Sequence, residues 1–270
     1  MTGTATAIAK ENAMNNDIPN LPNIRKETVS EAEWRARVDL AALYRLVDNY
    51  GWISLNYNHI GMRVPDQPDH FLIKVHSLMY HEVCASNLVK LRLDGKQAVW
   101  SENVNAAGFT IHSAALSARP DINCTIHIHT IAGAAVSAHP KGLLPLEQNG
   151  MRFYNRISYH EYEGIASRMD EAARIARDLG PTNKAMILRN HGLFTCGATP
   201  AEAMTVTRHL VEACEIQMTL EAAGAGFRIP SPELCEEGAR QMEQHEAKHS
   251  GDDWPAYLRL ADRTDPSYRS

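Results

Sequence analysis

Two histidines separated by one residue give the strongest chemical signal in the chain. They lie in the run Cys124-Thr-Ile-His127-Ile-His129, whose β-branched residues favour a strand. Side chains alternate along a strand, so His127 and His129 would project from the same face about 7 Å apart. Imidazole is the commonest protein ligand for metal ions. The spacing therefore predicts two ligands of one metal site.

A third imidazole follows a later apolar segment. His191 stands in Arg189-Asn-His191-Gly192, directly after an apolar run that ends at Leu188. Three neutral imidazoles with an open position are typical of a catalytic divalent ion, whereas structural zinc sites are more often closed by cysteines. We therefore predict that His127, His129 and His191 bind one divalent ion. Zinc, iron, manganese and cobalt all accept such ligands, so the residues alone do not name the metal.

The first half of the chain should supply a helix and several strands. Ser30 and Glu33 form a capping box, and apolar residues at helical spacing continue to about Asn49. Between Trp52 and Trp100, short apolar runs separated by turn residues predict strands. These runs are Ile53–Leu55, His59–Val64, Phe71–Val75 and Val89–Leu93.

In the second half, helical and strand patterns alternate. The sequence predicts helices over 111–118, 130–138, 163–178 and 199–223, and strands over 123–129, 185–189 and 193–196. Such alternation favours an α/β fold with helices flanking a sheet. We expect a flexible arm over residues 1–23, one domain over 24–225 and a helical tail over 226–270. Trp254 and Tyr257 suggest that this tail packs on the domain or on a neighbouring subunit.

Composition excludes several partners. The 270 residues carry 27 Lys and Arg against 32 Asp and Glu, and no basic stripe indicates nucleic acid binding. No apolar run approaches the roughly 18–20 residues that would cross a membrane. The five cysteines are scattered and form no C-x-x-C pair, which is typical of a reducing compartment. We therefore expect a cytoplasmic protein with no nucleic acid or membrane partner.

Several segments in this order resemble the class II aldolase/adducin family. They are Tyr57-Asn-His59-Ile60, Asn105–His112, Ala118–Asp121, His127-Ile-His129 and Asn190-His191-Gly192. The resemblance covers about Ser30 to Ala225. It implies a three-layer α/β/α class II aldolase-like fold with a central, mostly antiparallel sheet. It also implies a homotetramer with active sites near subunit interfaces, and one divalent ion on His127, His129 and His191.

Two departures from the family's sugar-phosphate aldolases bear on the substrate. Those aldolases carry a glutamate in a Ser-Ser-Glu segment, where this chain has Asn105-Ala-Ala-Gly108. They bind phosphate with Gly-Asn and Thr-Gly pairs, where this chain has Asn58-His59 and His76-Ser77. The resemblance therefore speaks against a phosphorylated sugar and favours a small anionic aromatic substrate.

The resemblance is strongest to the family's decarboxylases of hydroxylated pyridine dicarboxylates, such as 3-hydroxy-2-methylpyridine-4,5-dicarboxylate in vitamin B6 degradation. It implies a manganese-dependent carboxy-lyase whose metal chelates the ring hydroxyl and a neighbouring carboxylate. Three alternatives stay open. One is an aldolase (aldehyde-lyase) acting on an unphosphorylated hydroxy-keto acid, the second is an iron oxygenase, and the third is a non-catalytic adducin-like interaction module.

Further site residues are predicted from the resemblance and from their position. His76, Ser77 and Tyr80 stand where the family places substrate-facing residues. His59 has either this role or a structural one, and the structural one is slightly favoured. The proton donor is not identified, and its candidates, Glu147 and Tyr162, follow the His127 strand. The remaining histidines are expected to be surface or packing residues: His70, His81, His112, His139, His160, His209, His245 and His249.

Overall fold

One mixed sheet forms the centre of the molecule. The computed structural model describes residues 21–95, 104–166, 169–224, 226–249 and 251–270, so most of the predicted arm lies outside the described residues. The described strands form one sheet in the order β3-β2-β1-β4-β7-β6-β5, and all neighbours are antiparallel except β5 and β6. The strands are β1 (His59–Val64), β2 (Gln67–Ile73), β3 (Val89–Arg92), β4 (Cys124–Ile128), β5 (Ile157–His160), β6 (Ala185–Leu188) and β7 (Gly192–Gly197).

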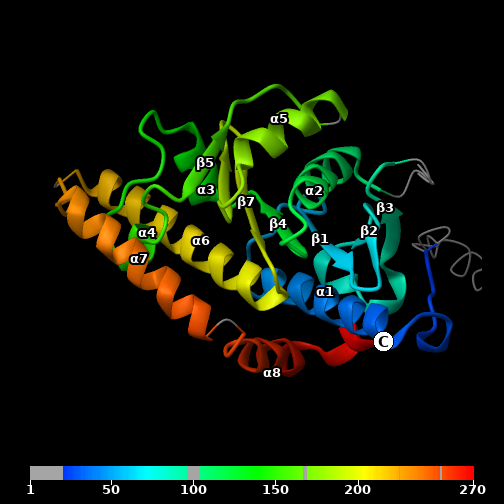
Figure 1. Ribbon diagram of the computed structural model, residues 1–270. Helices are drawn as coiled ribbons and strands as arrows, with labels where there is room; N and C mark the ends of the chain where they lie inside the picture. Colours follow the sequence, from blue (N-terminus) through cyan, green and yellow to red (C-terminus); the bar gives the residue numbers. More distant parts are fainter. Residues whose placement is uncertain (1–20, 96–103, 167–168, 225, 250) are drawn as a thin grey trace, which may run out of the picture.

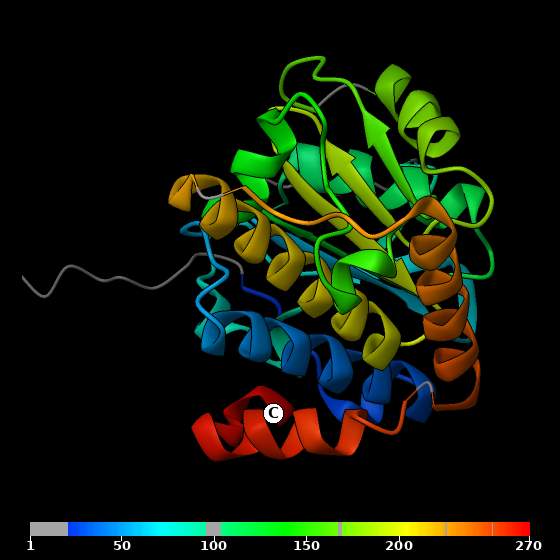
Figure 2. The ribbon, with the colours of Figure 1, turned by 90° about the vertical axis from the view of Figure 1, so that its left-hand side faces the viewer.

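Helices cover both faces of this sheet (Figures 1 and 2). They are α1 (Glu31–Asn49), α2 (Ala106–Ala118), α3 (Ile131–Ala138), α4 (Gln148–Met151), α5 (Met169–Leu179), α6 (Pro200–Ala223), α7 (Pro232–His249) and α8 (Trp254–Thr264). One apolar core joins the sheet to α1, α3 and α6, and a second joins the opposite face to α2 and α5. The predicted three-layer α/β/α fold with a mostly antiparallel sheet is confirmed.

Alternation along β4 places its side chains in two different layers. Ile126 and Ile128 lie in the core beneath α1 and α6, so Thr125 and His127 face the layer that contains α2. β4 pairs with β1 on one side and β7 on the other, with His127 opposite His59 in β1. The predicted histidine pair thus begins at the centre of the sheet.

Local signals located most elements correctly. Ser30 and Thr199 accept hydrogen bonds from the amides of Glu33 and Glu202, and α1 and α6 begin directly after these two caps. The strand predicted at 53–55 is wrong, because Leu55 has a φ of 49° and the segment turns. The helix predicted from 163 begins only at Met169, after a bend at 164–166. β5 and the short α4 were not predicted.

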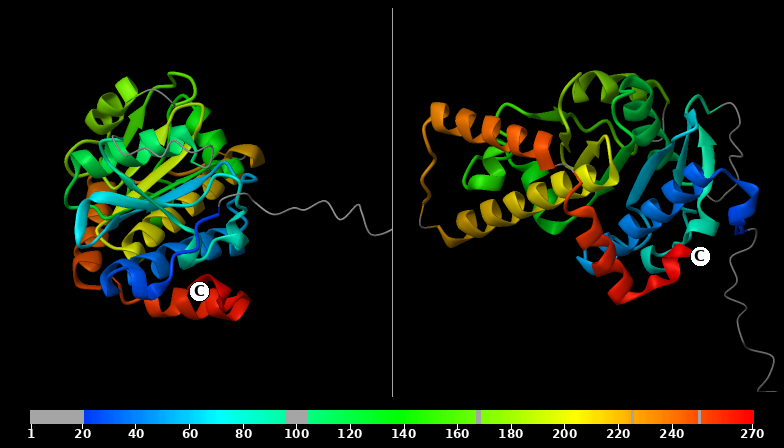
Figure 3. Two further views of the ribbon diagram at one scale, coloured as in Figure 1. Left: turned by 90° about the vertical axis from the view of Figure 1, so that its right-hand side faces the viewer. Right: turned by 60° about the horizontal axis from the view of Figure 1, so that its bottom comes forward.

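The C-terminal segment packs on the rest of the chain. α7 contacts α4 and lies across a cavity from α6, and α8 packs against α1 (Figure 3). Trp254 Nε1 donates to Asp39 Oδ1 at 3.2 Å, and Arg45 pairs with Asp265 at 2.9 Å. Among the described helices, none combines the length and the apolar character that a membrane span requires.

Candidate metal centre

Three imidazoles from separate parts of the fold converge on one point. His127 comes from β4, His129 from the residue after this strand, and His191 from the turn between β6 and β7. Their ring centroids are 4.6–4.8 Å apart, and one candidate ligand atom from each lies within 4.8 Å of the others. His127 is 1% exposed and the other two are half-buried. The structure therefore brings together the three histidines that the sequence analysis predicted.

The β4–β7 pairing fixes the ring of His127. Nδ1 of His127 lies 2.9 Å from the carbonyl oxygen of Leu193, one residue from its register partner Phe194. A carbonyl only accepts, so Nδ1 carries the proton and Nε2 keeps a lone pair. Protein metal sites commonly orient a ligand histidine through such a hydrogen bond to its other nitrogen.

A glycine and a strained turn place the other two rings. Asn190 has a φ of 53°, a conformation that asparagine tolerates better than most residues. The amide of His191 then donates to the hydroxyl of Ser137 in α3 at 3.1 Å. A Cβ atom on Gly192 would lie 2.7 Å from Cδ2 of His129. The His129 ring therefore occupies the space that only a glycine leaves free.

Electrostatics keep these imidazoles neutral. Burial lowers the pKa of His127 and His129, and burial together with the neighbouring His129 lowers the pKa of His191 to about 4. Only the neutral ring offers a lone pair to a metal ion. At neutral pH the cluster is thus three uncharged nitrogen donors around a common point. This donor set fits a divalent transition-metal ion.

A second set of imidazoles lies behind His127. The ring of His59 is 5.0 Å from that of His127, and its Nδ1 lies 2.9 Å from Nε2 of His112. Nδ1 of His112 in turn lies 2.7 Å from the hydroxyl of Thr125. His59 is 3% exposed, and burial lowers the pKa of His112 to about 3. His59 therefore lies within a buried hydrogen-bonded row, as the structural alternative for this residue predicts.

The segment that carries the predicted substrate residues is organised by a buried lysine. Nζ of Lys74 donates to the carbonyl oxygens of Asn56, His76 and Leu78 at 2.8–3.1 Å. Within this segment His76 is half-buried, and Ser77 is exposed. Tyr80 is fully buried, with its ring 4.9 Å from that of Tyr44. The substrate contacts of His76, Ser77, Tyr80 and His59 stay predictions.

The two candidate proton donors lie in different settings. The Glu147 carboxylate caps α4 and accepts hydrogen bonds from the amides of Asn149 and Gly150. Tyr162 is exposed and lines a small cavity together with His191. The same cavity is lined by His160 and Glu171. No spacing in the sequence links His160 and Glu171 to His191. Only the pairing of β5 with β6 and the packing of α5 bring these three residues together.

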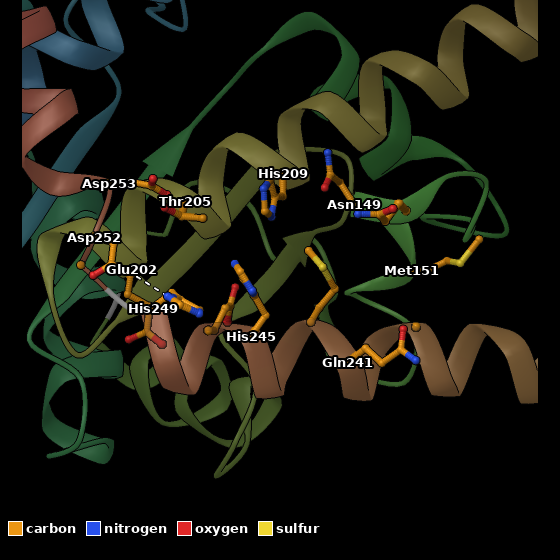
Figure 4. A pocket seen from close by; sticks show the side chains of 15 residues that line it. Asn149, Met151, Glu202, Thr205, His209, Gln241, His245, His249, Asp252 and Asp253 are labelled. Carbon is orange, nitrogen blue, oxygen red and sulfur yellow. Dashed lines mark hydrogen bonds and ion pairs between the residues drawn. The ribbon is translucent and has the colours of Figure 1, made fainter.

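A much larger cavity lies elsewhere. It measures about 910 Å³ and lies between α6 and α7, with His209, His245 and His249 in its wall (Figure 4). None of the three clustered imidazoles lines it. Cavity size therefore does not identify the candidate metal centre. Its cluster of donor atoms does.

Comparison with known proteins identifies the family. A model of the Class II Aldolase and Adducin N-terminal domain matches residues 38–218. A protein of Pseudomonas aeruginosa described by name as class 2 aldolase-like is 44% identical over 93% of this chain and 98% of its own. Rat α-adducin is 48% identical over 70% of this chain but only 26% of its own length.

Solved structures agree with this assignment. An aldolase II superfamily protein from Pseudomonas syringae superposes with a TM-score of 0.82 and 39% identity, over 90% of this chain and 98% of that one. L-fuculose 1-phosphate aldolase from Glaciozyma antarctica gives a TM-score of 0.75 and 25% identity, over 92% and 97% of the two chains. The chain therefore belongs to the class II aldolase/adducin family.

Proposed function

We propose that this protein is a divalent-metal-dependent carbon–carbon lyase whose metal is held by His127, His129 and His191. The convergence of three neutral imidazoles carries the proposal, because a protein that only binds partners has no need of it. Relatives named for aldolase activity support the same reaction class. When bound, a divalent ion supplies a Lewis acid that stabilises the electron pair left by carbon–carbon cleavage.

The substrate we propose carries no phosphate. Phosphate-binding sites need exposed backbone amides or free side-chain donors. Here the Asn58 amide donates to the carbonyl oxygen of Trp52, and Nδ1 of His59 is engaged by His112. Both residues are buried. Their hydrogen bonds are thus used within the fold, which favours an unphosphorylated anion.

Two lyase reactions fit this site. Aldol cleavage of an unphosphorylated hydroxy-keto acid agrees with the names of the relatives. Decarboxylation of a hydroxylated aromatic or pyridine dicarboxylate, with manganese as the metal, is the second candidate. The start of α2 favours it, since the side chain of Asn105 caps this helix in the segment where sugar-phosphate aldolases carry glutamate. Either substrate can chelate a metal through neighbouring oxygens.

The active site is proposed to lie near a subunit interface of a homotetramer. Ile131, two residues after His129, is 92% exposed, and Tyr162 at the neighbouring cavity is 57% exposed. Large apolar side chains at the rim of a site are typical of surfaces that another chain covers.

An adducin-like interaction module is the competing function, because α-adducin shares 48% identity with this chain. Metal content separates the two functions. Protein purified without chelator should contain about one divalent ion per chain, and protein that binds no added zinc or manganese would favour the interaction module.

A paired assay then identifies the reaction. Hydroxy-keto acids and hydroxylated pyridine or benzene dicarboxylates are each incubated with the zinc- and manganese-loaded protein, while aldehyde and carbon dioxide are measured together. Aldehyde release alone assigns the aldolase reaction, and carbon dioxide release alone assigns the decarboxylase. The variant His127→Ala, which lacks one ligand, should release neither product.

A further inference from the structure

His160 connects α5 to the turn that carries His191. It is the last residue of β5 and pairs with Leu188, the last residue of β6. Its carbonyl oxygen accepts a hydrogen bond of 2.8 Å from the amide of Arg189. Arg189 begins the turn that ends at His191. The backbone of His160 therefore holds this turn at its first residue.

The side chain of His160 is fixed from the opposite direction. It is 4% exposed, and its Nδ1 lies 2.7 Å from Oδ2 of Asp178 in α5. The carboxylate accepts, so the Nδ1 proton lies between the two residues. Burial on its own would raise the pKa of Asp178, but hydrogen bonds from His160 and Arg177 outweigh it and lower this pKa. Asp178 is thus an ionised acceptor that orients the ring.

His160 lines the same small cavity as His191. Its buried Nε2 lies 3.5 Å from Oε1 of the buried Glu171, and the described residues provide it with no hydrogen-bond partner. The wall of the cavity beside the metal centre thus contains an imidazole held on one nitrogen only. Nδ1, and not Nε2, makes the strong contact that fixes the ring.

The position of β5 makes this link consequential. β5 is an edge strand of the described sheet and is hydrogen-bonded to β6 alone. Such a strand lacks the second row of backbone hydrogen bonds that holds a central strand, so a side-chain contact to α5 can help to fix its position. His127 is held at the centre of the sheet by a direct bond from its ring to Leu193. His191, by contrast, is placed through its backbone, because its amide donates to Leu188 and Ser137.

From these contacts we propose that the hydrogen bond between His160 and Asp178 is a positioning device for the ligand His191. It anchors β5 to α5. The turn from Arg189 to His191 is thereby held where the ring of His191 meets those of the other two candidate ligands. The inference rests on the proposed metal-dependent function. It assigns a role to two residues that are not among the candidate ligands, so His160 is a positioning residue.

Two substitutions at His160 test the roles of its two ring nitrogens separately. In His160→Asn the amide nitrogen takes the place of Nδ1 and can still donate to Asp178, whereas in His160→Gln the amide lies near the position of Nε2 and the bond to Asp178 is lost. Asp178→Ala removes the acceptor at a side chain that is 19% exposed, so the fold should tolerate it. His249→Asn is the matched control, because Nδ1 of His249 pairs with Asp252 at 2.9 Å in a cavity that none of the candidate ligands lines.

The measurement is the affinity of the metal-free protein for Zn²⁺ and Mn²⁺ in competition with a chromophoric chelator. Circular dichroism and thermal unfolding of each metal-free variant establish that it is folded. Loss of an outer-shell contact typically weakens metal binding about 10–100-fold. We expect such a loss in His160→Gln and in Asp178→Ala, whereas His160→Asn and His249→Asn should stay within about threefold of the wild type.

The outcomes distinguish this inference from the proposed function. A wild-type chain that binds neither ion overturns both. A wild type that binds metal, together with folded His160→Gln and Asp178→Ala variants of unchanged affinity, overturns the positioning role alone. A change in melting temperature without a change in affinity would also overturn it, because a merely structural bond acts on stability only.

Discussion

Nε2 of His127 and Nε2 of His129 lie 2.8 Å apart. Two lone pairs repel at this distance, so a proton or a cation must lie between them. The Nδ1 proton of His127 is already engaged by Leu193, which leaves its Nε2 as an acceptor. Burial disfavours a charged ring at this place, as the lowered pKa of His127 indicates. A metal ion that accepts a lone pair from Nε2 of each ring can replace the shared proton.

Removal of one ligand should abolish metal binding. His129→Ala leaves two imidazoles, and we expect it to lose at least about 90% of the bound metal. In the wild type, zinc at a hundred times its Kd should stabilise the fold by about 2.7 kcal/mol. In the variant the same zinc concentration should not raise the melting temperature. His249→Ala is the control, and a full metal content in His129→Ala would contradict the assignment.

The metal-free protein should lose stability in mild acid. Burial holds the pKa of His191 at about 4 and that of His112 at about 3, whereas unfolded histidine titrates near 6.5. Below pH 6.5 the unfolded chain therefore binds protons that the folded chain excludes, and this difference lowers the free energy of unfolding.

Urea unfolding at pH 7, 6 and 5 measures this effect. The loss of stability per pH unit should be smaller in His112→Gln than in the wild type. The variant lacks one histidine that takes up a proton in the unfolded chain but not in the folded one. Equal slopes for the two proteins would show that His112 is not kept neutral by burial.

Periodicity and capping residues predict most of this fold because they act over a few residues. Ser30 and Thr199 mark helix starts through contacts with the next turn. The His-x-His spacing predicts the His127 and His129 pair for the same reason, since strand alternation alone puts both rings on one face. His191 was predicted because it directly follows an apolar strand and precedes a glycine, and the family resemblance then supported it. These predictions require no knowledge of tertiary contacts.

Features that depend on tertiary packing could not be predicted. β5 has only four residues, and its single partner in the sheet is the parallel strand β6. His160 reads as an ordinary histidine until Asp178 and Glu171 are placed beside it by α5. Leu55 shows the opposite error, since an apolar residue in a predicted strand adopts a left-handed turn conformation there. The clustering of the three candidate ligands was therefore predictable, but the residues that support them were not.

Loss of the buried lysine should destabilise the fold. Lys74→Met removes an ammonium group that binds several backbone carbonyl oxygens, and buried acceptors left without a donor cost about 1–3 kcal/mol. The matched control is Lys184→Met, which breaks an ion pair with Glu202 that is partly exposed to solvent and should cost at most about 1 kcal/mol. Chemical denaturation compares the two. Equal losses would mean that the carbonyl contacts of Lys74 contribute no more than a surface pair.

A single methyl group should disable the metal centre without unfolding the chain. In Gly192→Ala the new Cβ would lie 2.7 Å from both Cδ2 of His129 and the carbonyl oxygen of Ile128. The His129 ring can rotate away, but the Ile128 carbonyl belongs to β4 and cannot move without disturbing the strand. We therefore expect Zn²⁺ affinity to fall at least about tenfold, together with a loss of stability of roughly 1–3 kcal/mol.

The control for this substitution is Gly238→Ala in α7. There the new Cβ would meet no atom closer than Sδ of Met151 at 3.4 Å, and alanine favours a helix over glycine by about 1 kcal/mol. This variant should therefore bind Zn²⁺ like the wild type and melt at the same temperature or higher. Competition with a chelator and thermal unfolding measure both quantities. Wild-type Zn²⁺ affinity in Gly192→Ala would mean that His129 does not need its observed position, and that a centre of His127 and His191 with another ligand must be sought.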